Sequence, residues 1–342
     1  MIDLRSDTIT RPTPSMRRAM AAAEVGDDVY GEDPTVNRLQ DLMAERTGFE
    51  AGLLMPSGTM SNLTALSTHA GRGLEVIVPE GAHTYDSELG GMAVYAGLVP
   101  RPVRAPLGVP ELAVVRRAVR RSVHYAPPGA IVLENTHNSA GGTVVPLEVQ
   151  RQLGDFARFE GLPIHLDGAR AFNAAVALRV DIAEVCAPFD SASLCLSKGL
   201  GAPVGTVLLG SREFIERAHR NRKILGGGMR QAGVIAAAGI VAVTEGVERL
   251  VDDHRRARRL GERLMGLPGF EVNLAELQTN MVFATVADAP GLVAALEREG
   301  VRAGSMAPDR IRFVTHHQIS DGEIEMAADA VTRVLEGRTT TV

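Results

Sequence analysis

The chain has 342 residues, 45% of them hydrophobic and 23% charged, which is enough for one large domain and a smaller one. A net charge of −5 argues against nucleic-acid or anionic-membrane partners, and no apolar run reaches the ~20 residues of a membrane-spanning helix. The first residues lack a basic segment followed by an apolar one, and there are only two cysteines, Cys186 and Cys195. These features predict a cytoplasmic protein.

Short apolar segments alternate with amphipathic ones over the first 245 residues. The segment 146–161 has apolar residues at helical spacing, and six segments are predicted to be buried strands: 52–56, 75–80, 130–135, 162–167, 191–197 and 203–210. This order predicts an α/β fold with a large, mostly parallel sheet and helices on both faces.

The pattern changes after about residue 245. A basic helical stretch leads into short apolar runs, which predicts a smaller α+β domain. We therefore divide the chain into an N-terminal arm (1–15), a large domain (16–245) and a small C-terminal domain (246–342). The arginine-rich stretch 255–263 is expected to be a solvated helix face.

Three polar motifs follow predicted strands. "PSGTMSN" (56–62) places Gly58 and Thr59 at a helix start, where backbone N–H groups can bind a phosphate or simply be capped. Asp167 ends one strand, as a cap or as a ligand group, and Lys198 lies among glycines after another. Lys198 could reach solvent. In this order, however, a phosphate-binding helix start, an aspartate at a strand end and a lysine at a strand end are the three groups that hold pyridoxal 5'-phosphate (PLP). They bind its phosphate, its ring nitrogen and its aldehyde.

These motifs belong to a longer series in which the sequence resembles the low-specificity L-threonine aldolases. That family consists of PLP enzymes of fold type I, the aspartate aminotransferase-like fold. The resemblance covers nearly the whole chain, in the blocks 3–13, 25–40, 55–62, 81–85, 133–148, 165–175, 193–205, 226–233 and 312–317. It implies retro-aldol Cα–Cβ cleavage of L-threonine, L-allo-threonine and related β-hydroxy-α-amino acids to glycine and an aldehyde.

The resemblance also implies roles for residues at the cofactor. Lys198 would form the Schiff base with the PLP aldehyde, and Asp167 would keep the pyridine nitrogen protonated. His83 in "GAHTY" would stack on the ring, with a packed loop histidine as the alternative. Gly58 and Thr59 would bind the phosphate.

Further residues are implied to bind the substrate or to complete the site. Ser6, Arg170 and Arg312 match the family's clamp for the substrate carboxylate, and Arg170 would also lie against the cofactor. Arg170 could instead pair with a nearby carboxylate. Tyr30 is placed near the site, and Arg230 would reach the phosphate from a neighbouring subunit. The resemblance therefore implies a homo-oligomer, a tetramer, with sites shared between subunits.

Two histidines are candidates for the base that takes the β-hydroxyl proton. His83 could act directly or through water, and His124 could act from the loop before "AIVLEN" or lie on the surface. That loop lacks the arginine usual in the family. Glu134 and His137 could suggest a metal pair, but the resemblance implies no catalytic metal, and we interpret them as hydrogen-bonding groups at a strand end.

Two other functions fit parts of the pattern. The chain could be a different amino-acid lyase or racemase of the same fold. It could also be a non-catalytic ligand-binding protein, although the intact set of Lys198, Asp167, Arg170 and Arg312 argues against that.

Overall fold

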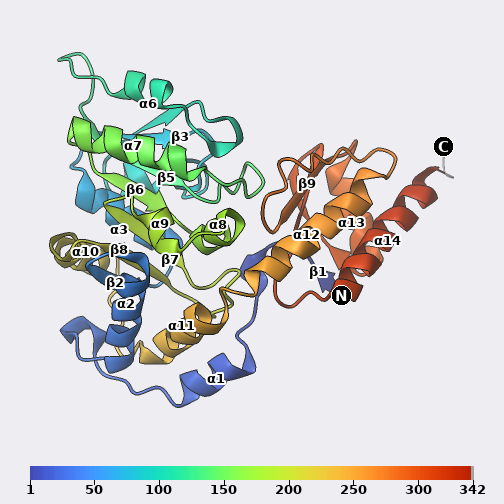
Figure 1. The fold of residues 1–342 in the computed structure, drawn as a ribbon, viewed down its shortest axis with the longest axis horizontal. Helices are drawn as coiled ribbons and strands as arrows, with labels where there is room; N and C mark the ends of the chain where they lie inside the picture. The colour runs from blue at the N-terminus through green and yellow to red at the C-terminus, as the bar shows by residue number, and fades with distance from the viewer. Residues whose placement is uncertain (340–342) are drawn as a thin grey trace.

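A seven-stranded sheet forms the centre of the larger part of the molecule (Figure 1). The computed structural model describes residues 1–339. The strand order is β2-β8-β7-β6-β5-β3-β4; β7 to β4 run parallel, and β8 is antiparallel to both β7 and β2. The strands are β2 (Ala51–Met55), β3 (Glu75–Pro79), β4 (Val99–Val103), β5 (Pro128–Glu134), β6 (Ile164–Asp167), β7 (Ser191–Cys195) and β8 (Thr206–Gly210).

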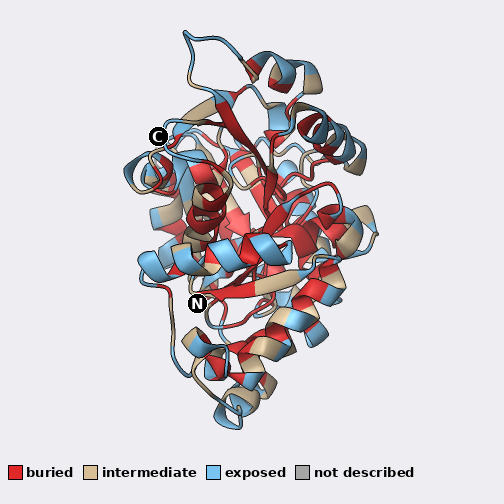
Figure 2. Cartoon of the chain, turned by 90° about the vertical axis from the view of Figure 1, so that its left-hand side faces the viewer, coloured by how far each residue is buried: buried red, intermediate tan, exposed pale blue. Residues whose placement is uncertain are grey.

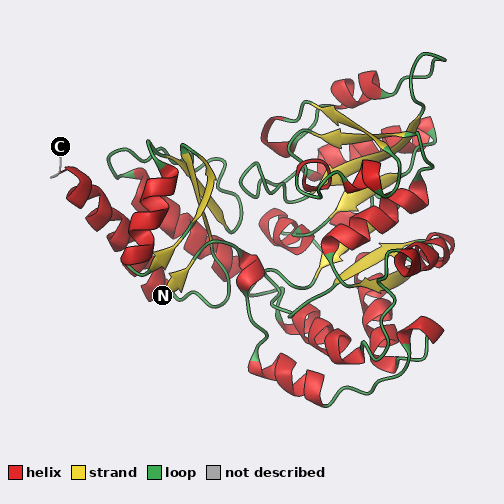
Figure 3. Ribbon diagram, turned by 180° about the vertical axis from the view of Figure 1, so that it is seen from behind, coloured by secondary structure: helices red, strands yellow, loops and turns green. Residues whose placement is uncertain are grey.

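Helices cover both faces of this sheet, because its central strands carry apolar residues on both faces (Figures 2 and 3). In β5, Ile131 and Leu133 join one core and Ala130 and Val132 another. On the first face lie α2 (Pro34–Thr47), α6 (Leu112–Ala118), α7 (Leu147–Glu160), α8 (Ala171–Leu178), α9 (Ile182–Cys186) and α11 (Gly233–Glu245). The second face carries α3 (Gly58–His69), the short α5 (Gly91–Val94) and α10 (Arg212–Ile224).

The predicted α/β fold is thus confirmed, with two differences in detail. The strand predicted at 203–210 begins only at Thr206, because Pro203 to Gly205 form the preceding turn. The strand β4 was missed, since its sequence "VPRPV" contains two prolines. Proline is tolerated there because β4 is an edge strand.

A second core lies in the smaller part of the molecule. It contains α12 (Leu250–Met265), α13 (Ala289–Arg298) and α14 (Asp321–Thr339), and an antiparallel sheet of β11 (Gly304–Ala307), β12 (Arg310–Val314) and β9 (Met281–Thr285). The first residues of the chain belong to this core. β1 (Ile2–Asp3) pairs in parallel with β10 (Val301–Arg302), and Ile2 and Leu4 are buried.

The N-terminal segment then crosses to the larger part. After a 3-10 turn, Asp7–Ile9, it forms α1 (Pro14–Ala21), which packs against α11. Further 3-10 turns are Asp28–Tyr30 and Pro106–Gly108, and a short helix α4 spans His83–Asp86. None of the helices in residues 1–339 is both long and apolar enough to cross a membrane.

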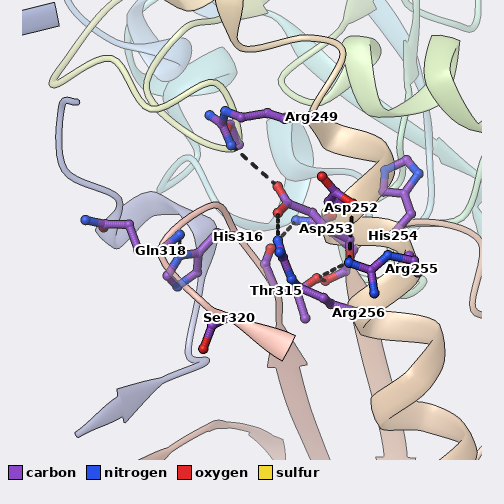
Figure 4. A network of polar contacts seen from close by, with 12 residues as sticks. Arg249, Asp252, Asp253, His254, Arg255, Arg256, Thr315, His316, Gln318 and Ser320 are labelled. Atoms are coloured by element: carbon purple, nitrogen blue, oxygen red, sulfur yellow. Dashed lines mark hydrogen bonds and ion pairs between the residues drawn. The ribbon is translucent and has the colours of Figure 1, made fainter. Parts of the chain in front are cut away.

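Helix α12 links the two cores, with Leu250 in the first and Leu260 in the second. A polar network surrounds its first turns (Figure 4). Asp253 is buried there, 3.9 Å from a guanidinium nitrogen of Arg249 and 3.7 Å from one of Arg256. Burial raises the pKa of Asp253 to about 7 against the pull of these two charges.

Most arginines of the stretch 255–263 are exposed, as expected for a solvated helix face, but they also form ion pairs. Arg255 and Arg256 both pair with Asp321, and Arg259 and Arg263 both pair with Glu325, so ion pairs hold α12 against α14. Their side chains remain partly exposed, which limits the stabilisation that each pair contributes.

We predict that Asp253→Asn stabilises the protein more at pH 8 than at pH 5. An aspartate in the unfolded chain has a pKa of about 3.9. Between that value and about 7 the folded state holds the extra proton, so this group makes the wild type less stable as pH rises through the window. Asparagine removes the effect, so its gain in stability over the wild type should be larger at pH 8 than at pH 5, by on the order of 3 kcal/mol.

Urea unfolding at the two pH values measures this difference. The matched control is Asp252→Asn, which changes the adjacent, half-exposed residue of the same helix and should give a small, pH-independent change. Equal effects of Asp253→Asn at both pH values would contradict the prediction.

Candidate active site

A cavity of about 300 Å³ lies beyond the carboxyl ends of β6 and β7, beside the start of α3. Open α/β sheets bind ligands at this edge. Five of the predicted site residues line the cavity: Gly58, Thr59, His83, Asp167 and Lys198. The other lining residues are Thr8, Pro56, Ser57, Asn62, Ala169, Cys195, Ser197, Pro203 and Val204.

The start of α3 supplies backbone N–H groups to the cavity. Ser57 caps the helix by accepting from the N–H of Met60 at 3.2 Å, and Gly58 and Thr59 are its first residues. The first N–H groups of a helix have no partner within it and favour an anion. Glycine allows a close approach here, since a Cβ at position 58 would lie 3.0 Å from Cys195 Sγ.

Asp167 is the last residue of β6 and is 2% exposed. Its Oδ2 accepts from Nδ2 of Asn62 at 2.9 Å, and its Oδ1 accepts from the N–H of Ala169 at 3.2 Å. A carboxylate has about four acceptor positions, so Asp167 can accept from a further donor in the cavity.

Lys198 follows β7 in a turn whose backbone is fixed from several sides. Its carbonyl accepts from the N–H of Gly201 and from Oγ1 of Thr10, both at 2.9 Å, while the carbonyl of Gly199 accepts from Arg249. Across residues 1–339, no hydrogen bond or ion pair engages its Nζ. The amine is therefore available to a ligand in the cavity.

His83 begins α4 and is held by two carboxylates. Its backbone N–H donates to Oε2 of Glu134 at 2.7 Å, and its Nδ1 lies 3.0 Å from Oε1 of Glu88. That hydrogen bond raises the pKa of His83 despite partial burial. Glu134 also accepts from the N–H of Asn138 at 2.9 Å, and burial together with Asp167 raises its pKa to about 7.

Glu134 thus fixes two loops at the end of β5. Nε2 of His137 lies 3.9 Å from Glu134, which is too long for a hydrogen bond. Burial lowers the pKa of His137 to about 4, so its ring is neutral.

One group of side chains has the spacing of metal ligands. The nearest ligand atoms of His83, Glu88 and Asp167 lie within 4.8 Å of one another. Nδ2 of Asn62, however, donates to both Glu88 and Asp167, at 3.0 and 2.9 Å. An N–H donor shared by the two carboxylates suits a hydrogen-bonded network better than a cation.

Arg170 is buried at the start of α8 and forms a two-pronged ion pair with Asp7. Its Nε donates to Oδ2 of Asp7 at 2.8 Å and its Nη2 to Oδ1 at 2.6 Å. Burial acts to raise the pKa of Asp7, but the charge and hydrogen bonds of Arg170 lower it to about 2. Arg170 therefore pairs with a carboxylate, as the alternative interpretation of the sequence allowed, and its Nη1 can donate to another acceptor.

Arg312, the second arginine of the clamp, meets Arg170 at Asn138. Nη1 of Arg170 and Nη1 of Arg312 both donate to Oδ1 of Asn138, at 3.3 and 3.4 Å. Nη2 of Arg312 donates to the carbonyl of Arg5 at 3.0 Å. Ser6 accepts from the N–H and hydroxyl of Thr8, so its hydroxyl caps the 3-10 turn that carries Asp7.

The clamp residues Ser6, Arg170 and Arg312 lie outside the lining of the cavity, and so do three further predicted residues. Arg230 is exposed and pairs with Asp27 at 2.9 Å, and Tyr30 is 74% exposed. His124 is exposed in the loop before β5. Because β5 begins at Pro128 and reaches the site at its other end, about 20 Å of strand separates that loop from the cavity edge. Within one chain, His124 thus lies in a surface loop, which is the alternative that the sequence left open, and its role as a base stays a prediction.

Sequence reasoning missed four residues that hold the site together, namely Asp7, Asn62, Glu88 and Asn138. Three of them stand inside or beside motifs that were recognised, but their partners lie far away in the chain. A polar residue on a buried helix face, as at Asn62, is the signal that could have found one of them.

Comparisons with known proteins agree with this geometry. Residues 3–287 match the beta-eliminating lyase family. A probable low-specificity L-threonine aldolase 2 of Arabidopsis thaliana is 46% identical over 95% of this chain and 94% of its own. The low specificity L-threonine aldolase of Escherichia coli K12 is 44% identical over 96% of this chain and 98% of its own.

Solved structures show the same fold at low identity. Leishmania major threonine aldolase superposes with a TM-score of 0.83 at 19% identity, covering 98% of this chain and 100% of that one. Sphingomonas wittichii serine palmitoyltransferase gives 0.79 at 17% identity, covering 99% and 88%. The fold is therefore that of fold type I enzymes. By sequence, the chain belongs to the beta-eliminating lyases and, within them, to the low-specificity L-threonine aldolase family.

Proposed function

We propose that this enzyme cleaves L-threonine, L-allo-threonine and related β-hydroxy-α-amino acids to glycine and an aldehyde. One observation carries the proposal: the amine of Lys198, the carboxylate of Asp167 and the start of α3 line a single cavity. Membership of the aldolase family supports this specific reaction within the lyases.

The residues of the cavity fit PLP as the cofactor. Lys198 would hold its aldehyde carbon, Asp167 its ring nitrogen, and Gly58 and Thr59 its phosphate. The fit rests on donor chemistry, because the amine has no partner in residues 1–339 and the carboxylate has acceptor capacity left. Bound here, PLP supplies an electron sink for the pair released when the Cα–Cβ bond breaks.

The arginine clamp orients the substrate. Nη1 of Arg170 and Nη1 of Arg312 both donate to Oδ1 of Asn138. The carboxylate of a substrate could accept from these two guanidinium groups in place of the Asn138 oxygen or beside it. Fixing the substrate carboxylate limits rotation about its Cα, and this rotation decides which bond is aligned for cleavage. Asp7 makes the clamp rigid, because it holds the other edge of Arg170.

His83 is the residue that we propose as the base for the β-hydroxyl proton. Glu88 accepts from Nδ1 of His83, so the lone pair is on Nε2 and the carboxylate stabilises the ring once Nε2 is protonated. His83 lines the cavity, whereas His124 does not.

We further propose a homo-oligomer, a tetramer, that shares its sites, working in the cytoplasm. Arg230 and Tyr30 are exposed on the chain, as residues that serve a neighbouring subunit must be. The two cysteines are free and buried, which is compatible with a reducing compartment.

Replacement of Lys198 tests the proposed reaction. With L-threonine and added PLP, aldehyde release should consume NADH in a coupled alcohol dehydrogenase assay, and Lys198→Ala should reduce the rate at least a thousandfold, to the background. Formation of a keto acid and ammonia instead would identify a different lyase. An unchanged rate in Lys198→Ala would overturn the assignment of Lys198.

Replacement of Asp7 tests the arginine clamp. Asp7→Asn should raise KM for L-threonine about tenfold, with a smaller effect on kcat, because Arg170 loses its ionic partner and its fixed orientation. Steady-state kinetics on the folded protein measure both constants. Asp155→Asn, which removes an exposed partner of Arg158, is the control and should leave both constants unchanged. A wild-type KM in Asp7→Asn would remove Asp7 from the clamp.

Mixing two variants tests whether active sites are shared between subunits. Lys198→Ala and Arg230→Ala should each be impaired as pure proteins. After mixed refolding, hybrid oligomers should regain activity, since Lys198 from one subunit and Arg230 from its neighbour then form intact sites. Absence of any gain over the sum of the pure variants would place Arg230 outside the neighbour's site.

A further inference from the structure

A chain of buried polar side chains runs behind Asp167. Asn62, which donates to Asp167, accepts through Oδ1 at 3.1 Å from Nε2 of His165. Nδ1 of His165 lies 2.7 Å from Oγ of Ser191, and Oγ of Ser191 lies 2.7 Å from Nε2 of His69. His165 and Ser191 are fully buried, and neither they nor His69 lines the cavity.

The chemistry of Asn62 sets the direction of every hydrogen bond in this chain. Nδ2 must face the acceptor oxygens of Glu88 and Asp167, since Oδ1 there would oppose two carboxylates. Oδ1 therefore faces His165, whose Nε2 must carry a proton and donate. The same Nε2 lies 3.4 Å from Oγ of Ser193, and in this longer contact Ser193 can only accept from the proton that already points to Asn62.

The rest of the chain follows from the neutral state of the two histidines. Burial lowers the pKa of His165 to about 3 and that of His69 to about 4. A neutral imidazole has one donor and one acceptor nitrogen. Nδ1 of His165 is then an acceptor for the hydroxyl of Ser191, whose oxygen accepts in turn from Nε2 of His69. The tautomer of His165 is thus fixed from both sides.

We propose that His165, through Asn62, is a positioning residue that orients the Asp167 carboxylate toward the ring nitrogen of the cofactor. This inference rests on the proposed function, because it assumes that PLP binds with its ring nitrogen at Asp167. Only Asn62 and the backbone N–H of Ala169 donate to the carboxylate within residues 1–339. Loss of the Nε2 donor frees the amide of Asn62 to turn, and the position of Asp167 is then no longer fixed.

The test measures the cofactor directly. The holoenzyme is prepared with PLP carrying ¹⁵N in the ring, and the ¹⁵N chemical shift reports whether the ring nitrogen is protonated. His165→Leu should move this shift toward the unprotonated value and raise the dissociation constant of PLP about tenfold, as expected for losing one hydrogen bond near a charge. His165→Gln, whose amide can donate to Asn62, should restore both values toward wild type.

Two further variants separate positioning from stability. Gln150→Met removes another fully buried polar side chain, whose one side-chain hydrogen bond within residues 1–339 goes to the carbonyl of Val145, and should leave the ¹⁵N shift unmoved whatever its effect on the melting temperature. Ser191→Ala frees the tautomer of His165 and should move the shift in the same direction as His165→Leu, but less. It decides the question if His165→Leu does not fold.

The outcomes distinguish the inference from the function on which it rests. If the wild type does not bind PLP, the proposed cofactor and reaction fail. If the wild type binds PLP with a protonated ring and the His165→Leu and Ser191→Ala holoenzymes show the same shift and affinity, the positioning role is overturned. In that case, the buried chain stabilises only the fold.

Discussion

The buried ion pair of Asp7 with Arg170 joins the parts of the molecule on which the site depends. Asp7 belongs to the N-terminal segment, Arg170 begins α8 in the larger part, and Asn280, just before β9 in the smaller part, also donates to Asp7 at 3.2 Å. Removing two charges from water costs several kcal/mol per ion, and only a well-aligned pair offsets this. The two-pronged geometry therefore specifies one placement of the N-terminal segment over the cavity.

Parallel pairing explains why the chemical groups meet at one edge. In the register of the sheet, Glu134 of β5 lies opposite Asp167 of β6, and Asp167 lies opposite Ser193 of β7, five residues before Lys198. These strands are buried on both faces, so a charged side chain can reach a ligand only past their ends. The sheet thus collects the groups, and the loops beyond it orient them.

Local pattern was enough to predict six of the seven strands of the large sheet and the residues at their ends. Gly58, Asp167 and Lys198 could be recognised because each follows an apolar run and has a distinct chemical use. The contacts of Asp7 and Asn138 could not be predicted, since they depend on how segments far apart in the sequence come to lie. For His124 the local sequence left two positions open, because it does not tell at which end of the sheet the loop before β5 lies.

The strand β1 has a consequence for how the chain is made. Ile2 is synthesised about 300 residues before Val301, the residue with which it pairs. During synthesis β1 therefore stays without its partner until the residues up to β10 have emerged, and an unpaired strand is a site for aggregation. β1 is only two residues long, and exposed charged residues flank its pairing region, which limits that hazard until the C-terminal part arrives.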